Sequence, residues 1–123
     1  MNNKGQTLVL FIFLIPIILF VSAFIIDTGI IYYETNKLNN LNKNVLKYGL
    51  DNNEEEKIRE LIFTNDKNIT NYKIIIDNNI LSIILEKEID SIFGKIIGIN
   101  SYNINSYYTG YKEENKYYIE RSV

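Results

Sequence analysis

Residues 5–29 read GQTLVLFIFLIPIILFVSAFIIDTG, and no residue from Leu8 to Ile26 carries a charge. An α-helix rises about 1.5 Å per residue, so a helix over this apolar run is about 28 Å long, close to the thickness of the hydrocarbon core of a bilayer. We therefore predict a membrane-spanning helix. Pro16 should kink it, because proline removes one backbone hydrogen bond, and membrane helices tolerate such kinks.

The residues that flank this run predict its orientation. Lys4 stands before the run, whereas Asp27 and Glu34 follow it. Basic residues favour the cytoplasmic side of a membrane, so we expect the N-terminus in the cytoplasm and the remainder of the chain outside. Tyr32 and Tyr33 would then lie at the outer interface, where aromatic side chains are common.

The alternative interpretation of this stretch is a secretion signal that is removed. Val21-Ser22-Ala23 supplies small residues of the kind that precede a signal-peptidase cleavage site, and the mature chain would then begin at Phe24. The apolar run, however, is longer than the roughly 7–15 residues usual in a signal peptide, and it continues through Ile26. A retained anchor is therefore the favoured prediction.

The composition narrows the classes of function. The 123 residues include no Cys and no His, which removes disulfides, thiolate metal sites and the usual catalytic bases. Of the 13 Lys and Arg residues only Lys4 precedes Asp27, which leaves 12 against 15 Asp and Glu in the rest of the chain. We predict that the protein is not an enzyme, has no cofactor or metal, and does not bind nucleic acid, whose phosphates attract Lys and Arg.

The segment after the apolar run continues the helical pattern. Apolar side chains recur there at spacings that place them on one side of a helix, namely Ile31, Leu38, Leu41, Val45 and Tyr48. Most residues between them, Asn42 included, are polar, so the helix should present one apolar stripe to a packed domain. It should end near Gly49. A coiled-coil seam is the alternative, although the run is short for one.

The next residues predict a second helix of about ten residues. The stretch Asp51-Asn52-Asn53 should supply its capping residue, and Glu54–Glu56 should occupy its first turn, where acids compensate the helix dipole. Ile58, Leu61 and Ile62 should form its apolar face.

The remainder of the chain reads as four strands. They are predicted at Tyr72–Asp77, Ile80–Glu86, Tyr102–Tyr111 and Lys116–Arg121, with turns at Asn78-Asn79 and Glu113-Glu114-Asn115. Asn68-Ile69-Thr70 should be a loop, and Ser91–Gly98 a short helix or tight crossover. Stacking the long helix on the sheet buries both apolar surfaces. We therefore predict an α+β fold: a long N-terminal helix, membrane-spanning in its first half, packed on a small antiparallel β-sheet of about four strands.

The N-terminal part of the chain resembles the TadE and TadG group of the Tad (Flp) pilus-assembly system, which is related to type IV pilins. Gly5-Gln6-Thr7-Leu8-Val9-Leu10-Phe11 and Leu14-Ile15-Pro16 are similar to the G-Q-A-x-V-x-F and L-x-P opening of that group. Ile26-Asp27-Thr28-Gly29 is similar to its I-D-x-G, and Lys37-Leu38-Asn39-Asn40 to its R-L-Q-N. Residues 92–99 also resemble the phenylalanine-then-LG segment that precedes the last strands of such proteins.

This resemblance implies a pilin-like fold and a structural role. Residues 1–5 would be a short leader, residues 6–31 a transmembrane helix and residues 32–123 an extracytoplasmic domain, either at the cell membrane or in a surface filament. A prepilin peptidase would cut between Gly5 and Gln6, while Asp27 and Gly29 would form a motif at the membrane edge. The implied partners are other pilin-like subunits and a Tad-type secretion machine with its ATPase, platform protein and prepilin peptidase.

Leu10 departs from the pilin pattern. At this position pilins carry a Glu, whose carboxylate pairs with the free amine of a neighbouring mature subunit. Leu10 cannot neutralise an amine or accept a hydrogen bond. The resemblance therefore implies an accessory or minor subunit, or a permanently anchored protein, and not the main pilin.

The alternative function is a single-pass, membrane-anchored extracellular binding module unrelated to pili. Its recognition surface would be formed by Tyr102, Tyr107, Tyr108, Tyr111, Tyr117 and Tyr118. Aromatic side chains are enriched at interfaces. Tyrosines that alternate along strands are, however, more often part of ordinary sheet packing.

Overall fold

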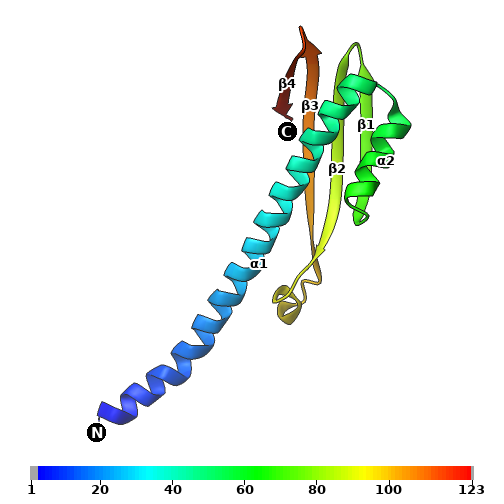
Figure 1. The fold of residues 1–123 in the computed structure, drawn as a ribbon. Coiled ribbons are helices and arrows are strands. Elements are labelled where there is room, and N and C mark those ends of the chain that lie inside the picture. The colour runs from blue at the N-terminus through cyan, green and yellow to red at the C-terminus, as the bar shows by residue number, and fades with distance from the viewer. Residues whose placement is uncertain (1–2, 123) are drawn as a thin grey trace.

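The computed structural model describes residues 3–122 and begins with one long helix (Figure 1). This helix, α1, spans Asn3–Asn52, and a short helix, α2, spans Glu55–Asn65. The strands are β1 (Ile69–Asp77), β2 (Ile80–Asp90), β3 (Ser101–Glu113) and β4 (Lys116–Arg121), with the single 3-10 turn η1 (Gly94–Ile97) between β2 and β3. The predicted α+β fold is thereby confirmed.

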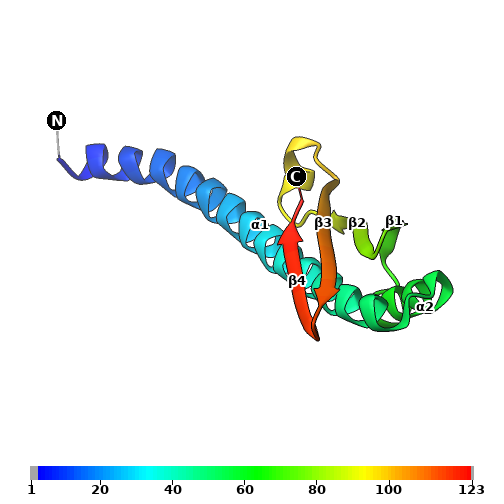
Figure 2. The ribbon, with the colours of Figure 1, turned by 90° about the horizontal axis from the view of Figure 1, so that it is seen from above.

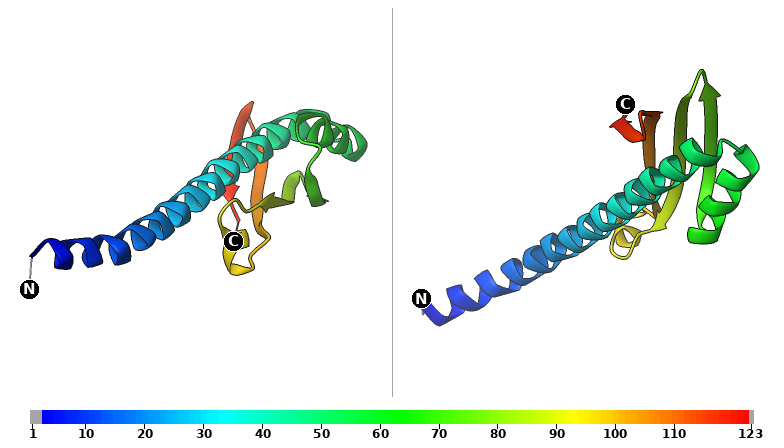
Figure 3. Two further views of the ribbon diagram at one scale, coloured as in Figure 1. Left: turned by 90° about the horizontal axis from the view of Figure 1, so that it is seen from below. Right: turned by 45° about the horizontal axis from the view of Figure 1, so that its top comes forward.

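The four strands form one sheet in the order β1-β2-β3-β4, and all neighbours are antiparallel. The second half of α1 lies along one face of this sheet, and α2 packs beside its end (Figure 2). The first half of α1 extends away from the sheet as a separate rod, which is clearest in Figure 3. We call its apolar part, residues 8–26, the stem.

The helix α1 is continuous because no residue in it forces an end. It passes through Pro16 without a break and continues to Asn52. Beyond the stem, side chains of one face are buried against the sheet. Leu38 and Val45 confirm the predicted stripe, Ile31, Leu41 and Tyr48 are half-buried, and Leu46, which the sequence pattern missed, is fully buried.

One expectation for the second half of α1 was wrong. Asn42 is completely buried, although the pattern places it among the polar residues outside the stripe. The helix ends at Asn52, close to Gly49 as predicted, but Gly49 itself is a packing residue: a Cβ on it would lie 2.6 Å from Leu81 Cδ2 and 2.8 Å from Ile58 Cδ1. Gly49 therefore permits close approach, and the chain turns at Asn53, which has φ of 50° and donates its N–H to the Gly49 carbonyl over 2.7 Å.

The second helix forms as predicted, with Ile58 and Ile62 buried, but its start differs. Asp51 still belongs to α1 and does not cap α2. The residue before α2 is Glu54, whose side chain makes no capping hydrogen bond. The prediction of a capping residue among Asp51, Asn52 and Asn53 was wrong, because α1 continues to Asn52 and Glu54 precedes α2.

Both hairpin turns follow from residues that tolerate positive φ. Asn78 and Asn79 have φ of 43° and 69°, and they join β1 to β2 as predicted. Glu114 and Asn115 have φ of 51° and 66° at the tip of the β3–β4 hairpin. The connection between β2 and β3 is the expected tight turn.

The expected loop at residues 68–70 was wrong in part. Ile69 and Thr70 already belong to β1, and Ile69 is buried in the core. The core holds one contiguous set of apolar side chains between α1, α2 and the sheet: Leu38, Val45, Leu46, Ile58, Ile62, Ile69, Leu81, Ile83, Leu85, Ile89, Ile104 and Tyr108.

Leu46 provides a test of this packing. Leu46→Ala should lower the free energy of unfolding by about 2–5 kcal/mol, because Leu46 is fully buried and the cavity can collapse only in part. The measurement is urea unfolding of the full chain in detergent micelles, followed by tyrosine fluorescence. Its exposed neighbour Lys47 supplies the control, since Lys47→Ala should change stability by less than about 0.5 kcal/mol. Equal effects of the two substitutions would contradict the packing.

Candidate functional site

The stem exposes its apolar side chains on all sides. Phe13 and Phe24 are 68% and 71% exposed, and the other large apolar residues from Leu8 to Ile26 are exposed as well. A soluble protein rarely leaves so large a contiguous apolar surface uncovered. Among residues 3–122, α1 is the helix whose length and composition suit a membrane span, so the chain is compatible with a single-pass membrane anchor.

Asp27 marks the place where the stem meets the packed domain. Its side chain is only 5% exposed, and both carboxylate oxygens accept hydrogen bonds from the connection between β2 and β3. Oδ1 accepts the backbone N–H groups of Ile92 and Phe93 at 3.1 and 3.2 Å. Oδ2 accepts the N–H of Gly94 at 2.8 Å and the hydroxyl of Tyr102 at 2.9 Å.

This arrangement satisfies a charge that would otherwise be costly to bury. A carboxylate taken out of water needs compensating hydrogen bonds, and Asp27 has four. Three of the donors are consecutive backbone amides, which together form a concave anion site. The carboxylate in turn satisfies amides at the start of η1 that have no partner within the turn. Asp27 therefore fixes the β2–β3 connection to α1.

Gly94 is required for this contact. A Cβ on Gly94 would lie 2.6 Å from the Tyr102 hydroxyl oxygen and 3.1 Å from the Ile99 carbonyl oxygen. Any side chain would push Tyr102 away from Asp27 or open the turn. The short separation lets one carboxylate bind both the amide of residue 94 and the phenol from β3.

The structure separates the other residues singled out in the sequence. Gly29 is exposed, and no atom lies within 4 Å of a Cβ built on it, so it does not join Asp27. Gly5 and Gln6 lie in the exposed first turns of α1. Leu10 is 62% exposed on the stem. The packed domain thus begins at Asp27, inside the predicted 6–31 helix.

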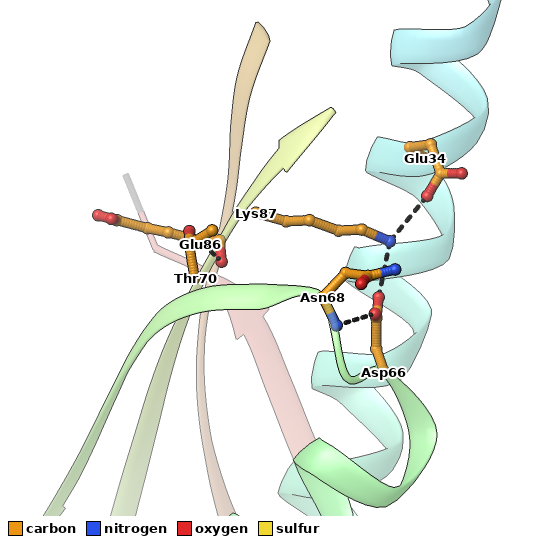
Figure 4. Close-up of polar contacts among 6 residues, drawn as sticks. All are labelled: Glu34, Asp66, Asn68, Thr70, Glu86 and Lys87. Atoms are coloured by element: carbon orange, nitrogen blue, oxygen red, sulfur yellow. Dashed lines mark hydrogen bonds and ion pairs between the residues drawn. The ribbon is translucent and has the colours of Figure 1, made fainter. Parts of the chain in front are cut away.

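A second polar contact joins three elements above Asp27 (Figure 4). Lys87 of β2 extends toward α1, and its Nζ lies 3.0 Å from Glu34 Oε2 and 2.7 Å from Asp66 Oδ2. The Lys87 side chain is only 9% exposed. Asp66, just after α2, also accepts the N–H of Asn68 at 2.9 Å, which holds the chain where β1 begins. Lys87, Glu34 and Asp66 form no pattern in the sequence that predicts this cluster, because they lie far apart along the chain.

The pairing shifts the ionisation of both partners. Burial by itself lowers the pKa of Lys87, but hydrogen bonds to Asp66 and Glu34 outweigh it and leave the pKa raised. Burial by itself raises the pKa of Asp66, but the Lys87 ammonium and the Asn68 N–H outweigh it and leave that pKa lowered. Both groups are therefore held in their charged forms at neutral pH.

Two further polar residues join α1 to the sheet. Asn42 Nδ2 donates to the Ile83 carbonyl at 3.0 Å and to the Ser106 carbonyl and hydroxyl, both at 3.1 Å. Asp51 accepts a hydrogen bond from Lys112 at 2.7 Å and one from the Tyr117 hydroxyl at 2.6 Å. Asp27, Glu34, Asn42 and Asp51 are thus 7, 8 and 9 residues apart and bind the sheet and its β2–β3 connection at successive heights along α1. The separation of Asp51 from Asn42 is about two and a half helical turns, so no simple helical spacing marks these four residues in the sequence.

The six tyrosines do not form one surface. Tyr108 is buried in the core, while Tyr102 and Tyr117 donate hydrogen bonds to carboxylates of α1. Tyr111 and Tyr118 stack on the opposite face of the sheet with ring centres 4.9 Å apart, and both are partly exposed. Among residues 3–122, no group of three or more His, Cys, Asp or Glu side chains is arranged to hold a metal ion.

The Asp27 contact can be tested by hydrogen exchange. Asp27→Asn replaces one of the two acceptor oxygens with a donor and removes the charge, so either the amides of Ile92 and Phe93 or the amide of Gly94 lose their acceptor. We expect the free energy of unfolding to fall by about 1–3 kcal/mol and the amides of Ile92, Phe93 and Gly94 to exchange faster. Thr28→Ala, at an exposed neighbouring position, is the control. Undiminished protection of these amides in Asp27→Asn would contradict the contact.

The Lys87 cluster can be tested through the pH dependence of stability. Lys87→Met should destabilise the protein by on the order of 3 kcal/mol at pH 7, because it leaves two carboxylates facing each other without a cation. The pKa of Asp66 is lowered on folding, so its contribution is present above about pH 4, near the unfolded value, and is lost as the pH falls through the folded value. The difference between wild type and variant should therefore shrink on acidification.

The raised pKa of Lys87 predicts a second loss of stability, at high pH. Its contribution is complete below the unfolded value of about 10.5 and is lost as the pH rises through the folded value. Chemical denaturation at a series of pH values measures the loss of stability at low pH and at high pH. Lys57→Met, which breaks the exposed Lys57–Glu54 pair, should cost less than about 1 kcal/mol and serves as the control. A stability difference that stays constant from pH 3 to pH 7 would exclude the assigned roles.

No protein-family model, curated protein or solved structure matches this chain. Inference of function therefore rests on its own residues: the exposed apolar stem, the buried Asp27 junction and the polar contacts that hold α1 on the sheet.

Proposed function

We propose that this chain is a non-enzymatic, pilin-like accessory or minor subunit of a Tad or type IV pilus-like assembly or secretion system. The stem crosses the cell membrane once, with the N-terminus in the cytoplasm and the α+β domain outside. The subunit works beside other pilin-like subunits and a machine that comprises an ATPase, a platform protein and a prepilin peptidase. Its role is structural.

The observation that carries this proposal is the division of one continuous helix between two environments. Residues 3–52 form a single helix, of which the apolar stem is exposed and the second half is packed on the sheet. A rigid link of this kind passes a force on the domain directly to the stem, which suits a subunit that is moved as one body. The TadE/TadG-like residues in the first 45 positions support the same proposal.

The stem can exchange lipid for neighbouring helices at little net cost. Lipid chains and apolar side chains are equally apolar, so helix association in a membrane depends on packing and not on the hydrophobic effect. Leu10 contributes apolar surface where a pilin carries its assembly carboxylate, and it is exposed on the stem. A subunit without that carboxylate has less to fix its register in a long filament, which favours an accessory or minor role.

The alternative is a membrane-anchored binding module. One observation favours it: the stacked and partly exposed Tyr111–Tyr118 pair on the sheet face opposite α1. Three of the other four tyrosines contribute less to such a surface, because Tyr108 is in the core and Tyr102 and Tyr117 bind carboxylates of α1. The pilin-like proposal uses the whole of α1 and is preferred.

The native N-terminus tests the proposal. The chain purified from the membranes of cells that carry a Tad-type system should begin at Gln6, because a prepilin peptidase cuts after Gly5. Mass spectrometry of the intact protein measures the start directly. Gly5→Leu should retain the leader, whereas Gly29→Leu, at an exposed glycine without neighbours, should be processed normally.

Each other outcome has a distinct meaning. An intact leader on a membrane-bound chain would indicate a permanent anchor and overturn processing as a pseudopilin. A chain that begins at Phe24 and leaves the membrane would contradict the anchor itself.

A further inference from the structure

The connection between β2 and β3, residues 91–100, exposes apolar side chains at the end of the sheet nearest the stem. We call it the isoleucine loop. Ile92, Ile96, Ile97 and Ile99 are 55%, 74%, 59% and 39% exposed, respectively. In Figure 1 the loop lies at the lower end of β2 and β3, beside the middle of α1. Four isoleucines are thus exposed within eight residues, and exposed apolar side chains gathered in this way mark interaction sites.

Many backbone groups of the loop are hydrogen-bonded within the protein. The amides of Ile92, Phe93 and Gly94 donate to Asp27. Further internal bonds are Ser91 N–H to Asn100, Ile96 N–H to Phe93, Gly98 N–H to Lys95 and Ile99 N–H to Gly94, with the Ser91 hydroxyl donating to Ile99 and Asn100. Each such bond lowers the cost of bringing non-helical backbone close to lipid. The loop therefore combines a backbone that is bonded at many positions with exposed apolar side chains.

The isoleucine loop lies beside the C-terminal part of the stem, at the same level along α1. A small apolar crevice of about 50 Å³ lies between them, and its lining includes Phe20 and Phe24 of the stem and Ile96 and Ile97 of the loop. Phe24 and Phe20 precede Asp27 by three and seven residues, which places them about 5–10 Å below it at 1.5 Å per residue. When residues 8–26 are in hydrocarbon, Ile96 and Ile97 are thus at membrane depth.

We propose that the isoleucine loop is a second membrane contact, which inserts Ile92, Ile96 and Ile97 into the headgroup and acyl boundary of the outer leaflet. The inference rests on the proposed anchoring of the stem. The occupant of the patch is lipid because the patch is continuous with the stem surface and is held at that level by Asp27. A depth of about 5–10 Å is typical of interfacial apolar segments.

The charges around the loop agree with an apolar contact and not with an electrostatic one. Lys95 is the single charged residue of the loop, and it is exposed, so its ammonium can extend to a lipid phosphate while Ile96 and Ile97 insert. Glu88 and Asp90 precede the loop at the end of β2 and offset this positive charge. Insertion should therefore occur in uncharged phosphatidylcholine and should not require anionic lipid.

Two contacts fix the domain more firmly than one. With the stem alone, the domain could tilt about the membrane edge as the helix tilts. With the loop inserted as well, the sheet is held at one height and one rotation relative to the membrane. The Tyr111–Tyr118 pair, near the β3–β4 turn at the far end of the sheet, would then face away from the lipid.

Depth-dependent quenching tests the proposal on the full chain. The protein has no Trp, so single substitutions report one position each in vesicles of phosphatidylcholine with or without bromine on the acyl chains. Ile96→Trp places the probe on the loop at a site that is 74% exposed, so the fold should tolerate it. Phe20→Trp reports the stem, and Tyr118→Trp reports the far end of the sheet. We expect bromolipid to reduce the emission of Ile96→Trp and Phe20→Trp and to leave that of Tyr118→Trp unchanged.

The three positions separate failure of this inference from failure of the anchor. Quenching at Phe20 without quenching at Ile96 would overturn the loop contact and leave the anchor intact. Emission that is unquenched at both positions would overturn the anchor and the loop contact together. Protection of the Ile96 probe that depends on the ratio of protein to lipid would assign the patch to a second copy of the chain and also overturn the proposal.

Discussion

The carboxylate of Asp27 connects the two parts of this protein. It lies one residue beyond the apolar run, is almost completely buried, and accepts hydrogen bonds from three consecutive amides and a tyrosine hydroxyl. A buried charge with so many partners is stable only while the β2–β3 connection stays on α1. The position of the sheet relative to the stem, and hence of the isoleucine loop relative to a membrane, follows from this contact.

Above Asp27, the rest of α1 is held on the sheet by a combination of apolar packing and spaced polar contacts. Leu38, Val45 and Leu46 bury apolar surface, which supplies most of the stabilisation. Glu34, Asn42 and Asp51 add hydrogen bonds to β2, β3 and β4 at three heights. Polar contacts have stricter geometry than apolar ones, so they set the register of the helix on the sheet.

The same helix is an exposed apolar stem, compatible with a membrane anchor, at one end and a core element at the other. The proposed pilin-like role depends on this continuity, because the domain and the stem move as one body. The isoleucine loop belongs to the same region, because the residues whose amides bind Asp27 are followed by side chains that face outward at the level of the stem. The Asp27 junction and the proposed membrane contact of the loop then form one structural unit.

The sequence by itself determined the elements of this fold, because their signals are local. Charge-free length predicted the stem, apolar spacing predicted the second half of α1, and paired Asn residues predicted the β1–β2 turn. Asp27 was also identified, as a membrane-edge residue, but its partners were not. Asp27 is 65 to 75 residues from them, Asn42 is 41 and 64 residues from its acceptors, and Lys87 is 53 residues from Glu34. The tertiary structure alone decided which polar groups meet. It also decided the burial of Asn42 and the continuation of α1 past Gly49, since those contacts exist only once helix and sheet have packed.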